Sequence, residues 1–126
     1  MRSSLRILIV DDQPRARQSL RALLAARFQV DQVHEAGNGA QALACVEAYC
    51  PDVVFMDARM PELDGIEATR MIRRASPRVK VIVLSMYPEY RAPALAAGAD
   101  AFFSKGEPPD ELLAVLTRLQ SNSHLP

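Results

Sequence analysis

The fold of this chain is constrained most by a regular alternation of short apolar runs and longer amphipathic segments. Apolar runs of about four to eight residues are typical of buried strands, whereas apolar residues that recur at helical spacing predict helices. We expect strands at 5–10, 30–35, 52–56, 79–84 and 101–103. We expect helices that begin at Pro14, Asn38, Asp64, Arg91 and near Pro108.

Two of the expected helices begin with a capping-box pattern. Asn38 with Gln41, and Asp64 with Glu67, have the spacing at which a cap side chain and the residue three positions later exchange hydrogen bonds. This pattern explains Asp64 and the following Gly65 as a helix cap and a turn, without any chemistry. The apolar face expected for the third helix consists of Met71, Ile72 and Ala75.

Five successive βα units predict an α/β domain with a parallel sheet, helices on both faces and right-handed crossovers. Eight units would close a barrel, so five favour an open, doubly wound sheet. At 126 residues the chain fits one domain. We place it at residues 1–120 and interpret residues 121–126, SNSHLP, as a tail: a frayed end or the start of a truncated linker.

Charge and hydropathy argue against several classes of protein. The 15 basic residues balance 15 acidic ones, unlike a domain that coats nucleic acid through phosphate contacts. No apolar run approaches the roughly 18 residues of a membrane span, and the chain reaches Asp11 too early for a signal peptide. We therefore expect a cytoplasmic protein without membrane contact. Cys45 and Cys50 lack the spacing of a zinc or redox site, so we expect two reduced thiols.

Polar side chains stand at the ends of four predicted strands. They are Asp11 and Asp12, Asp57, Ser85, and Lys105. Each one alone has an ordinary explanation as a helix cap, a turn residue or a solvated charge. Ligands of open parallel sheets bind beyond the carboxyl ends of the strands, so the coincidence of these residues at that edge predicts a functional site.

The chemistry that such a set favours is phosphoryl transfer to a carboxylate. Clustered carboxylates have raised pKa values unless a cation neutralises them, and Mg²⁺ prefers oxygen ligands of this kind. A carboxylate can attack phosphorus to form an aspartyl phosphate, whose charge is stabilised by a metal, a cationic side chain and a hydroxyl. Lys105 and Ser85 would supply the last two.

These residues together resemble the receiver domain of two-component response regulators. The likeness rests on the Asp11-Asp12 pair, Asp57 within D-x-x-M-P-x-x-D-G, Ser85 after VIVL and Lys105 after GADAFFS. It extends over nearly the whole chain, residues 5–119. It implies a flavodoxin-like (CheY-like) fold with the strand order 2-1-3-4-5.

The resemblance also implies a role for each residue of the set. Asp57 would accept a phosphoryl group from a sensor histidine kinase, and Lys105 would pair with that group. The Mg²⁺ ligands would be Asp11, Asp12, Asp57 and the backbone carbonyl of Arg59. The switch would consist of Ser85, whose hydroxyl turns toward the phosphoryl oxygens, and Phe102, which moves inward with it. Receivers catalyse only their own phosphorylation and dephosphorylation, so we expect no separate enzyme activity.

Residues 84–116 are most similar to receivers of the NarL/FixJ (LuxR-type) class, which implies control of transcription. Such receivers usually precede a helix-turn-helix domain that contacts DNA, a contact that the receiver itself would not make. Phosphorylated receivers change the face around the fourth helix and fifth strand, or form homodimers. Gly106 replaces the proline that most receivers have after the lysine, which leaves the geometry of the Lys105–Gly106 bond open.

Three further residues border the expected site. In this family the positions of Arg59, Met86 and Tyr87 tune how easily donors and water reach the phosphoryl group, so these bulky side chains could slow its hydrolysis. The simpler interpretation is that they are surface residues with no kinetic role.

Two other functions fit this sequence less well than the phosphorylation switch. A haloacid-dehalogenase-like phosphohydrolase also uses an aspartate at a strand end, but it needs an Asp-x-Asp motif, whereas this chain has Asp11-Asp12-Gln13. An interaction module that keeps only the fold would not need all five receiver positions to be filled by suitable residues.

Overall fold

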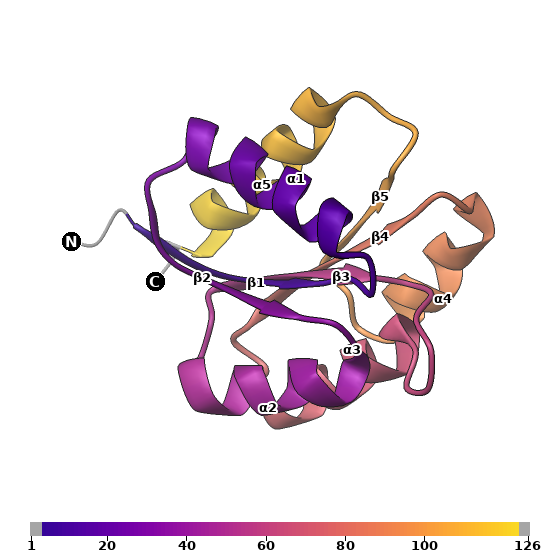
Figure 1. Cartoon of the computed structure of the whole chain (residues 1–126). Coiled ribbons are helices and arrows are strands. Elements are labelled where there is room, and N and C mark those ends of the chain that lie inside the picture. Colours follow the sequence, from indigo (N-terminus) through magenta and orange to yellow (C-terminus); the bar gives the residue numbers. More distant parts are fainter. Residues whose placement is uncertain (1–3, 124–126) are drawn as a thin grey trace.

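Five strands pair in parallel in the order β2-β1-β3-β4-β5 in this computed structural model, which describes residues 4–123 (Figure 1). The strands are β1 Leu5–Val10, β2 Val30–Ala36, β3 Val53–Asp57, β4 Lys80–Ser85 and β5 Ala101–Ser104. The helices are α1 Pro14–Arg27, α2 Gly39–Tyr49, α3 Gly65–Ala75, α4 Arg91–Ala96 and α5 Pro109–Ser123. The predicted fold class and strand order are confirmed.

The sheet forms the middle of three layers, with α1 and α5 on one face and α2, α3 and α4 on the other (Figure 1). Successive residues of a strand point to opposite faces of a sheet. In β3, Val54 and Met56 therefore join the core cluster under α2, α3 and α4, whereas Val53 and Phe55 join the cluster under α1 and α5. Most residues of the interior strands β1, β3 and β4 are apolar, as expected for strands that are buried on both faces.

Four of the five strands, β2, β3, β4 and β5, end one residue later than the sequence predicts. Asp57 pairs with Leu84 and is the last residue of β3, and Ser85 pairs with Ser104 and is the last residue of β4. Both polar residues are thus held by the sheet itself and not by the loops that follow. A 3₁₀ turn at Pro88–Tyr90, which the sequence did not indicate, leads from β4 into α4.

The buried face of α3 differs from the expected one. Ile72 is buried, but Met71 is 38% exposed and Ala75 is also exposed. The buried residues are Gly65, Ala68, Thr69 and Ile72, which recur at helical spacing. The helix takes this orientation because Gly65, at its first position, lies directly against the end of β3.

The helix caps form only half of the predicted capping boxes. Asn38 Oδ1 accepts a hydrogen bond from Gln41 N–H at 2.9 Å, and Asp64 Oδ1 accepts one from Glu67 N–H at 2.8 Å. In return, the Gln41 side chain accepts from Gly37 N–H, one residue before the cap, and Glu67 pairs with Arg70. The assignment of Asp64 as a helix cap is therefore confirmed.

The carboxyl-terminal helix extends into the expected tail. Helix α5 continues to Ser123, so residues 121–123 are helical, and residues 124–126 of the expected tail lie outside the described part of the chain. Neither glycine nor proline occurs between residues 110 and 125, so no helix-ending residue stands at the expected boundary.

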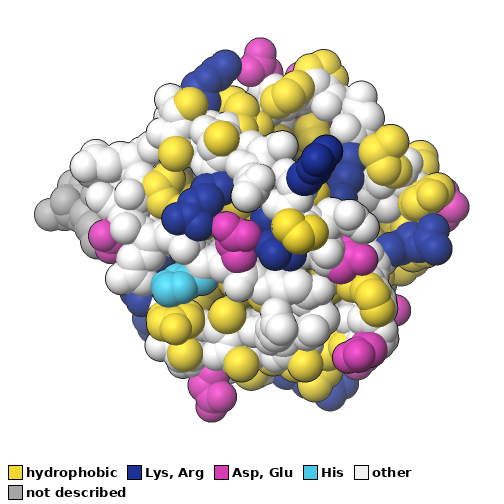
Figure 2. All heavy atoms as spheres, viewed as in Figure 1, with side chains coloured by type: hydrophobic (Ala, Val, Ile, Leu, Met, Phe, Trp, Pro, Cys, Tyr) yellow, Lys and Arg dark blue, Asp and Glu magenta, His cyan; other side chains and the backbone are white. Residues whose placement is uncertain are grey.

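The surface agrees with the balanced composition. On the face shown in Figure 2, basic and acidic side chains are interspersed, without a large patch of one sign. Among residues 4–123, no helix is long and apolar enough to cross a membrane.

Candidate functional site

Backbone hydrogen bonds beyond the strand ends fix the carboxyl edge of the sheet. Ala58 N–H donates to Leu84 O at 2.9 Å, and Lys105 N–H donates to Ser85 O at 2.8 Å. Asp11 N–H likewise donates to the carbonyl of Ala36, at 3.1 Å. The ladder thus continues through the site residues, and each of their side chains starts from a fixed main chain.

Three carboxylates meet at this edge. Asp11 is 5% exposed and Asp57 9% exposed, while Asp12 is half-buried. One oxygen from each of the three lies within 4.8 Å of the others. Strands β1 and β3 are neighbours in the sheet, so the residues that end them are brought side by side.

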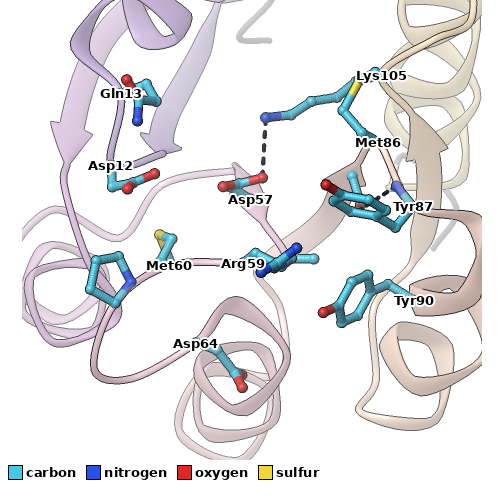
Figure 3. Close-up of a pocket in the computed structure, with 13 residues that line it drawn as sticks. Asp12, Gln13, Asp57, Arg59, Met60, Asp64, Met86, Tyr87, Tyr90 and Lys105 are labelled. Carbon is cyan, nitrogen blue, oxygen red and sulfur yellow. Dashed lines mark hydrogen bonds and ion pairs between the residues drawn. The ribbon is translucent and has the colours of Figure 1, made fainter.

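One cation bridges two of these carboxylates. The Lys105 Nζ atom lies 3.1 Å from Asp11 Oδ2 and 3.1 Å from Asp57 Oδ1, and Figure 3 shows it reaching over Asp57 from β5. Burial raises the pKa of Asp57, Lys105 opposes this effect, and the charges of Asp11 and Asp12 add to it, so the pKa stays above its usual range. Burial alone would lower the pKa of Lys105, but the carboxylates of Asp57 and Asp11 outweigh it and raise that pKa.

Asp11 and Asp12 differ in how they are held. Asp11 Oδ1 accepts a hydrogen bond from Gln13 N–H at 2.9 Å, and Oδ2 accepts from Lys105 at 3.1 Å. Figure 3 shows the Asp12 carboxylate pointing across the groove toward Asp57. Asp11 is therefore tied to the protein through both oxygens, whereas Asp12 faces open space in which a ligand can bind.

This donor set fits a hard divalent cation. Mg²⁺ is bound through one or two carboxylates and keeps several of its waters, and receiver domains generally bind it at an acidic site. Asp12 and Asp57 line an open groove of about 880 Å³, which leaves room for such waters. Arg59 also lines the groove, in the loop that begins directly after Asp57. Its backbone carbonyl, which the sequence predicts as a ligand, therefore belongs to a residue of the groove.

Ser85 and Phe102 occupy adjacent strands near the site. Ser85 is 2% exposed and lines the groove, and its Oγ accepts a hydrogen bond from Tyr87 N–H at 3.0 Å. Phe102 pairs with Val83 in the sheet and is half-buried against the core cluster under α2, α3 and α4. The serine hydroxyl therefore faces the site, while the phenylalanine packs on the side of α4.

An arginine and two tyrosines form the opposite wall of the groove. The Arg59 guanidinium lies 5.2 Å from the centre of the Tyr87 ring, and the Tyr87 and Tyr90 rings meet edge to face with centres 6.2 Å apart (Figure 3). The Asp64 carboxylate points away from Asp57. The sequence grouped Arg59, Met86 and Tyr87 beside the site, and all three line the groove, but it did not indicate Tyr90.

Gly65 is the positioning residue that the sequence assigned only to a turn. A Cβ atom at Gly65 would lie 1.9 Å from the carbonyl oxygen of Asp57, and Gly65 N–H donates to Ala58 O at 3.1 Å. The first turn of α3 therefore packs directly on the backbone of Asp57. A glycine directly after a helix cap was the available signal, because the cap itself does not require a residue without a side chain.

The loop after Lys105 has ordinary geometry. Every peptide bond within residues 4–123 is trans, including Lys105–Gly106. Gly106 is exposed, and the nearest atom to a Cβ there would be Ser104 Oγ at 3.8 Å.

Comparisons with known proteins agree with this geometry. The model of the family described as response regulator receiver domain matches residues 7–117. The uncharacterized transcriptional regulatory protein YhcZ of Bacillus subtilis (strain 168) is 40% identical over 111 residues, 86% of this chain and 52% of YhcZ. The response regulator UvrY of Escherichia coli (strain K12) is 36% identical over 117 residues, 91% of this chain and 54% of UvrY. The chain spans about half the length of these curated relatives.

Solved structures show the same fold. A two-component response regulator of the LuxR family from Aurantimonas sp. SI85-9A1 superimposes with a TM-score of 0.90 at 31% identity, over 95% of this chain and 87% of that one. The response regulator domain of Thermotoga maritima CheB does so with a TM-score of 0.83 at 26% identity, over 98% of both chains.

Replacing Gly65 by alanine is expected to destabilise the protein by about 2–3 kcal/mol, the cost of forcing an extra methyl into a packed site. The new Cβ would lie 1.9 Å from Asp57 O, so the helix or the end of β3 must shift. Urea denaturation measures the effect. Gly106→Ala is the matched control and should change stability by less than about 0.5 kcal/mol. Equal stability of the two variants would contradict the proposed packing.

Asp57→Asn is expected to raise the melting temperature at pH 7 in buffer without Mg²⁺. The pKa of Asp57 is raised, so its ionised form destabilises the folded state. This cost is absent below the ordinary pKa of an aspartate and grows as the pH rises through the raised folded pKa. An effect of about 1 kcal/mol would be roughly 3–6 °C for a domain of this size, and it should shrink toward acidic pH.

Asp64→Asn is the control for this measurement, because asparagine also caps helices and the lost charge points away from the site. It should melt close to the wild type. An Asp57→Asn variant that melts at or below the wild-type temperature at pH 7 would show that Lys105 outweighs burial.

Proposed function

The chain belongs to the response regulator receiver family and is related to LuxR-type transcription regulators, and on that premise we propose that Asp57 accepts a phosphoryl group from a sensor histidine kinase. Phosphorylation then changes the conformation of the domain and controls an output domain or partner. Receiver domains are signalling domains and not classical enzymes, so the only catalysis proposed is of this phosphorylation and its reversal.

The observation that carries the proposal is the environment of Asp57. Its carboxylate is 9% exposed at the end of a buried strand, 3.1 Å from the Lys105 ammonium and beside two further carboxylates. A buried acid with a perturbed pKa, a cationic partner and an open groove is the pattern of a reactive group more than of a structural one. An ordinary structural acid would be satisfied inside the fold and would not need the groove.

Each side chain of the site has a defined task in the proposed reaction. A bond forms between a carboxylate oxygen of Asp57 and phosphorus while the bond between phosphorus and the histidine nitrogen of the kinase breaks. Lys105, already paired with Asp57, is within reach of the negative oxygens of the arriving group. Asp11, Asp12, Asp57 and the backbone carbonyl of Arg59 would hold Mg²⁺, which would supply further positive charge to the site.

We propose that Ser85 and Phe102 convert this charge into a conformational change. The Ser85 hydroxyl accepts a hydrogen bond from Tyr87 N–H, so turning toward a phosphoryl oxygen would release the segment that leads into α4. Phe102 is half-buried beside that segment and has no hydroxyl of its own, so its alternative positions would differ in burial and packing alone. To act as a near-complete switch, phosphorylation must favour one state by about 5 kcal/mol.

The remaining parts of the proposal concern the longer protein. The relatives reported above, a transcriptional regulatory protein and a response regulator, are about twice the length of this chain. Control of transcription would therefore pass through a DNA-binding output domain and not through residues 1–120. Homodimerisation on phosphorylation and a cytoplasmic location belong to the same proposal. Membership of the receiver family leaves no support for the haloacid-dehalogenase alternative.

Acetyl phosphate with Mg²⁺ is expected to add one phosphoryl group, about 80 Da, to the wild type and none to Asp57→Asn. Intact-protein mass spectrometry measures the product. Asp64→Asn serves as the control, because it removes a nearby carboxylate whose role is to cap α3. A wild type that remains unmodified would favour the phosphorylation-independent interaction module.

Arg59→Ala and Tyr87→Ala are each expected to speed hydrolysis of the phosphorylated protein by about two- to fivefold. This range corresponds to the roughly 0.5–1 kcal/mol of an exposed cation–π contact, which holds the two side chains over the groove. Phosphate release from the isolated phosphoprotein measures the rate. Tyr87→Phe keeps the ring and should behave like the wild type, and unchanged rates in both alanine variants would leave these residues without a kinetic role.

A further inference from the structure

Arg17 of α1 joins the loop after β1 to the neighbouring strand β2. Its Nε atom donates to Glu35 Oε1 at 2.8 Å, and its Nη1 atom donates to the backbone carbonyl of Asp11 at 2.6 Å. The side chains of Arg17 and Glu35 are only 19% and 26% exposed. Arg17 lies outside the lining of the groove, so it reaches the acidic site through the Asp11 backbone alone.

Glu35 gives this arginine a rigid partner. It lies in β2, paired with Ile9 of β1, so its backbone is fixed by the sheet. The hydrogen bond from Arg17 lowers the pKa of Glu35 against the effect of burial, and Arg21 adds a second bond to Oε2 at 3.0 Å. The carboxylate is therefore ionised at neutral pH and holds Arg17 in one orientation.

The Asp11 carbonyl is the point at which β1 turns into α1. Asp11 N–H continues the sheet by donating to Ala36 O, but the carbonyl points out of the ladder and is met by the Arg17 guanidinium. This carbonyl belongs to the peptide group that joins Asp11 to Asp12. The orientation of that peptide plane sets the direction in which the Asp12 side chain leaves the main chain.

We propose that Arg17 is a positioning residue for the metal site. Because it donates hydrogen bonds to both the Asp11 carbonyl and Glu35, it fixes the Asp11–Asp12 peptide so that the Asp12 carboxylate faces Asp57. The inference rests on the proposed function, because it assumes that Mg²⁺ binds among these acids. Groups that orient a metal ligand from behind set its affinity without touching the metal.

Arg21 provides a matched control within the same network. It lies one turn further along α1, carries the same charge and pairs with the same Glu35 carboxylate, but it does not contact the Asp11 carbonyl. If the network serves only to attach α1 to the sheet, loss of either arginine should affect the site equally. If Arg17 positions Asp12, only its loss should do so.

The first measurement is a titration of the unphosphorylated protein with Mg²⁺, in which the NMR chemical shifts of amides near Asp57 report binding. Arg17→Ala is expected to weaken Mg²⁺ binding by about tenfold, the lower end of the range for residues that orient a metal ligand. Arg21→Ala should stay within about twofold of the wild type, the range left to a surface charge. Arg17→Lys should weaken Mg²⁺ binding almost as much as Arg17→Ala, because one ammonium cannot make both of the hydrogen bonds that a guanidinium makes.

A second measurement separates positioning from general damage. The rate of phosphorylation by acetyl phosphate, followed against Mg²⁺ concentration, should show a raised half-saturating concentration in Arg17→Ala but a maximal rate close to that of the wild type. A variant that is merely less stable would melt earlier without this shift. If Arg17→Ala does not fold, Arg17→Lys carries the same comparison.

The possible outcomes are distinct. Equal Mg²⁺ affinity in the wild type and the Arg17 variants overturns the inference and leaves the proposed function intact. An equal loss in Arg17→Ala and Arg21→Ala also overturns it, because charge alone would then explain the effect. A wild type that binds no Mg²⁺ overturns the proposed function, and the inference falls with it.

Discussion

The contact of Lys105 with Asp11 and Asp57 is the interaction on which the carboxyl edge of this sheet depends. The strand order places β1 beside β3, so the acids that end these strands meet whether or not their charges are balanced. Strand β4 lies between β5 and β3, so a side chain at the end of β5 must be long to contact Asp57. The lysine side chain is long enough to do so. Without the ammonium, three carboxylates would share a partly buried site with no cation. Even with Lys105 in place, the pKa of Asp57 is raised, which shows that its ionised form is disfavoured there.

The backbone of the site was predictable because its signals are local. Buried parallel strands are short apolar runs, and a charged residue at the end of such a run marks its carboxyl edge. The order of the strands, by contrast, came from the resemblance to receivers, since apolar runs alone do not say which strands are neighbours. The orientation of α3 was missed for a related reason: Met71 and Ile72 are equally apolar, and what decides between them is the contact of Gly65 with the Asp57 backbone.

Side-chain links between distant elements left no mark in the sequence. Arg17 and Glu35 are 18 residues apart, and Arg73 bonds both Gly98 O and the Asp100 carboxylate across more than 20 positions. An arginine on a helix looks the same in the sequence whether its partner is water or a half-buried glutamate. Such links become visible only once the sheet has placed the partners together, which is why the support of the site could not be inferred along with the site.

The two ends of β4 differ in a way that suits the proposed switch. At its amino end, Asp100 accepts hydrogen bonds from Val81 N–H and from Arg73, which fixes the strand to α3. At its carboxyl end, Ser85 is followed by exposed side chains, a 3₁₀ turn and the six-residue helix α4. A short helix with few buried residues is among the parts of a protein that rearrange at low free-energy cost. A new charge on Asp57 would therefore move this segment more easily than the amino end of β4.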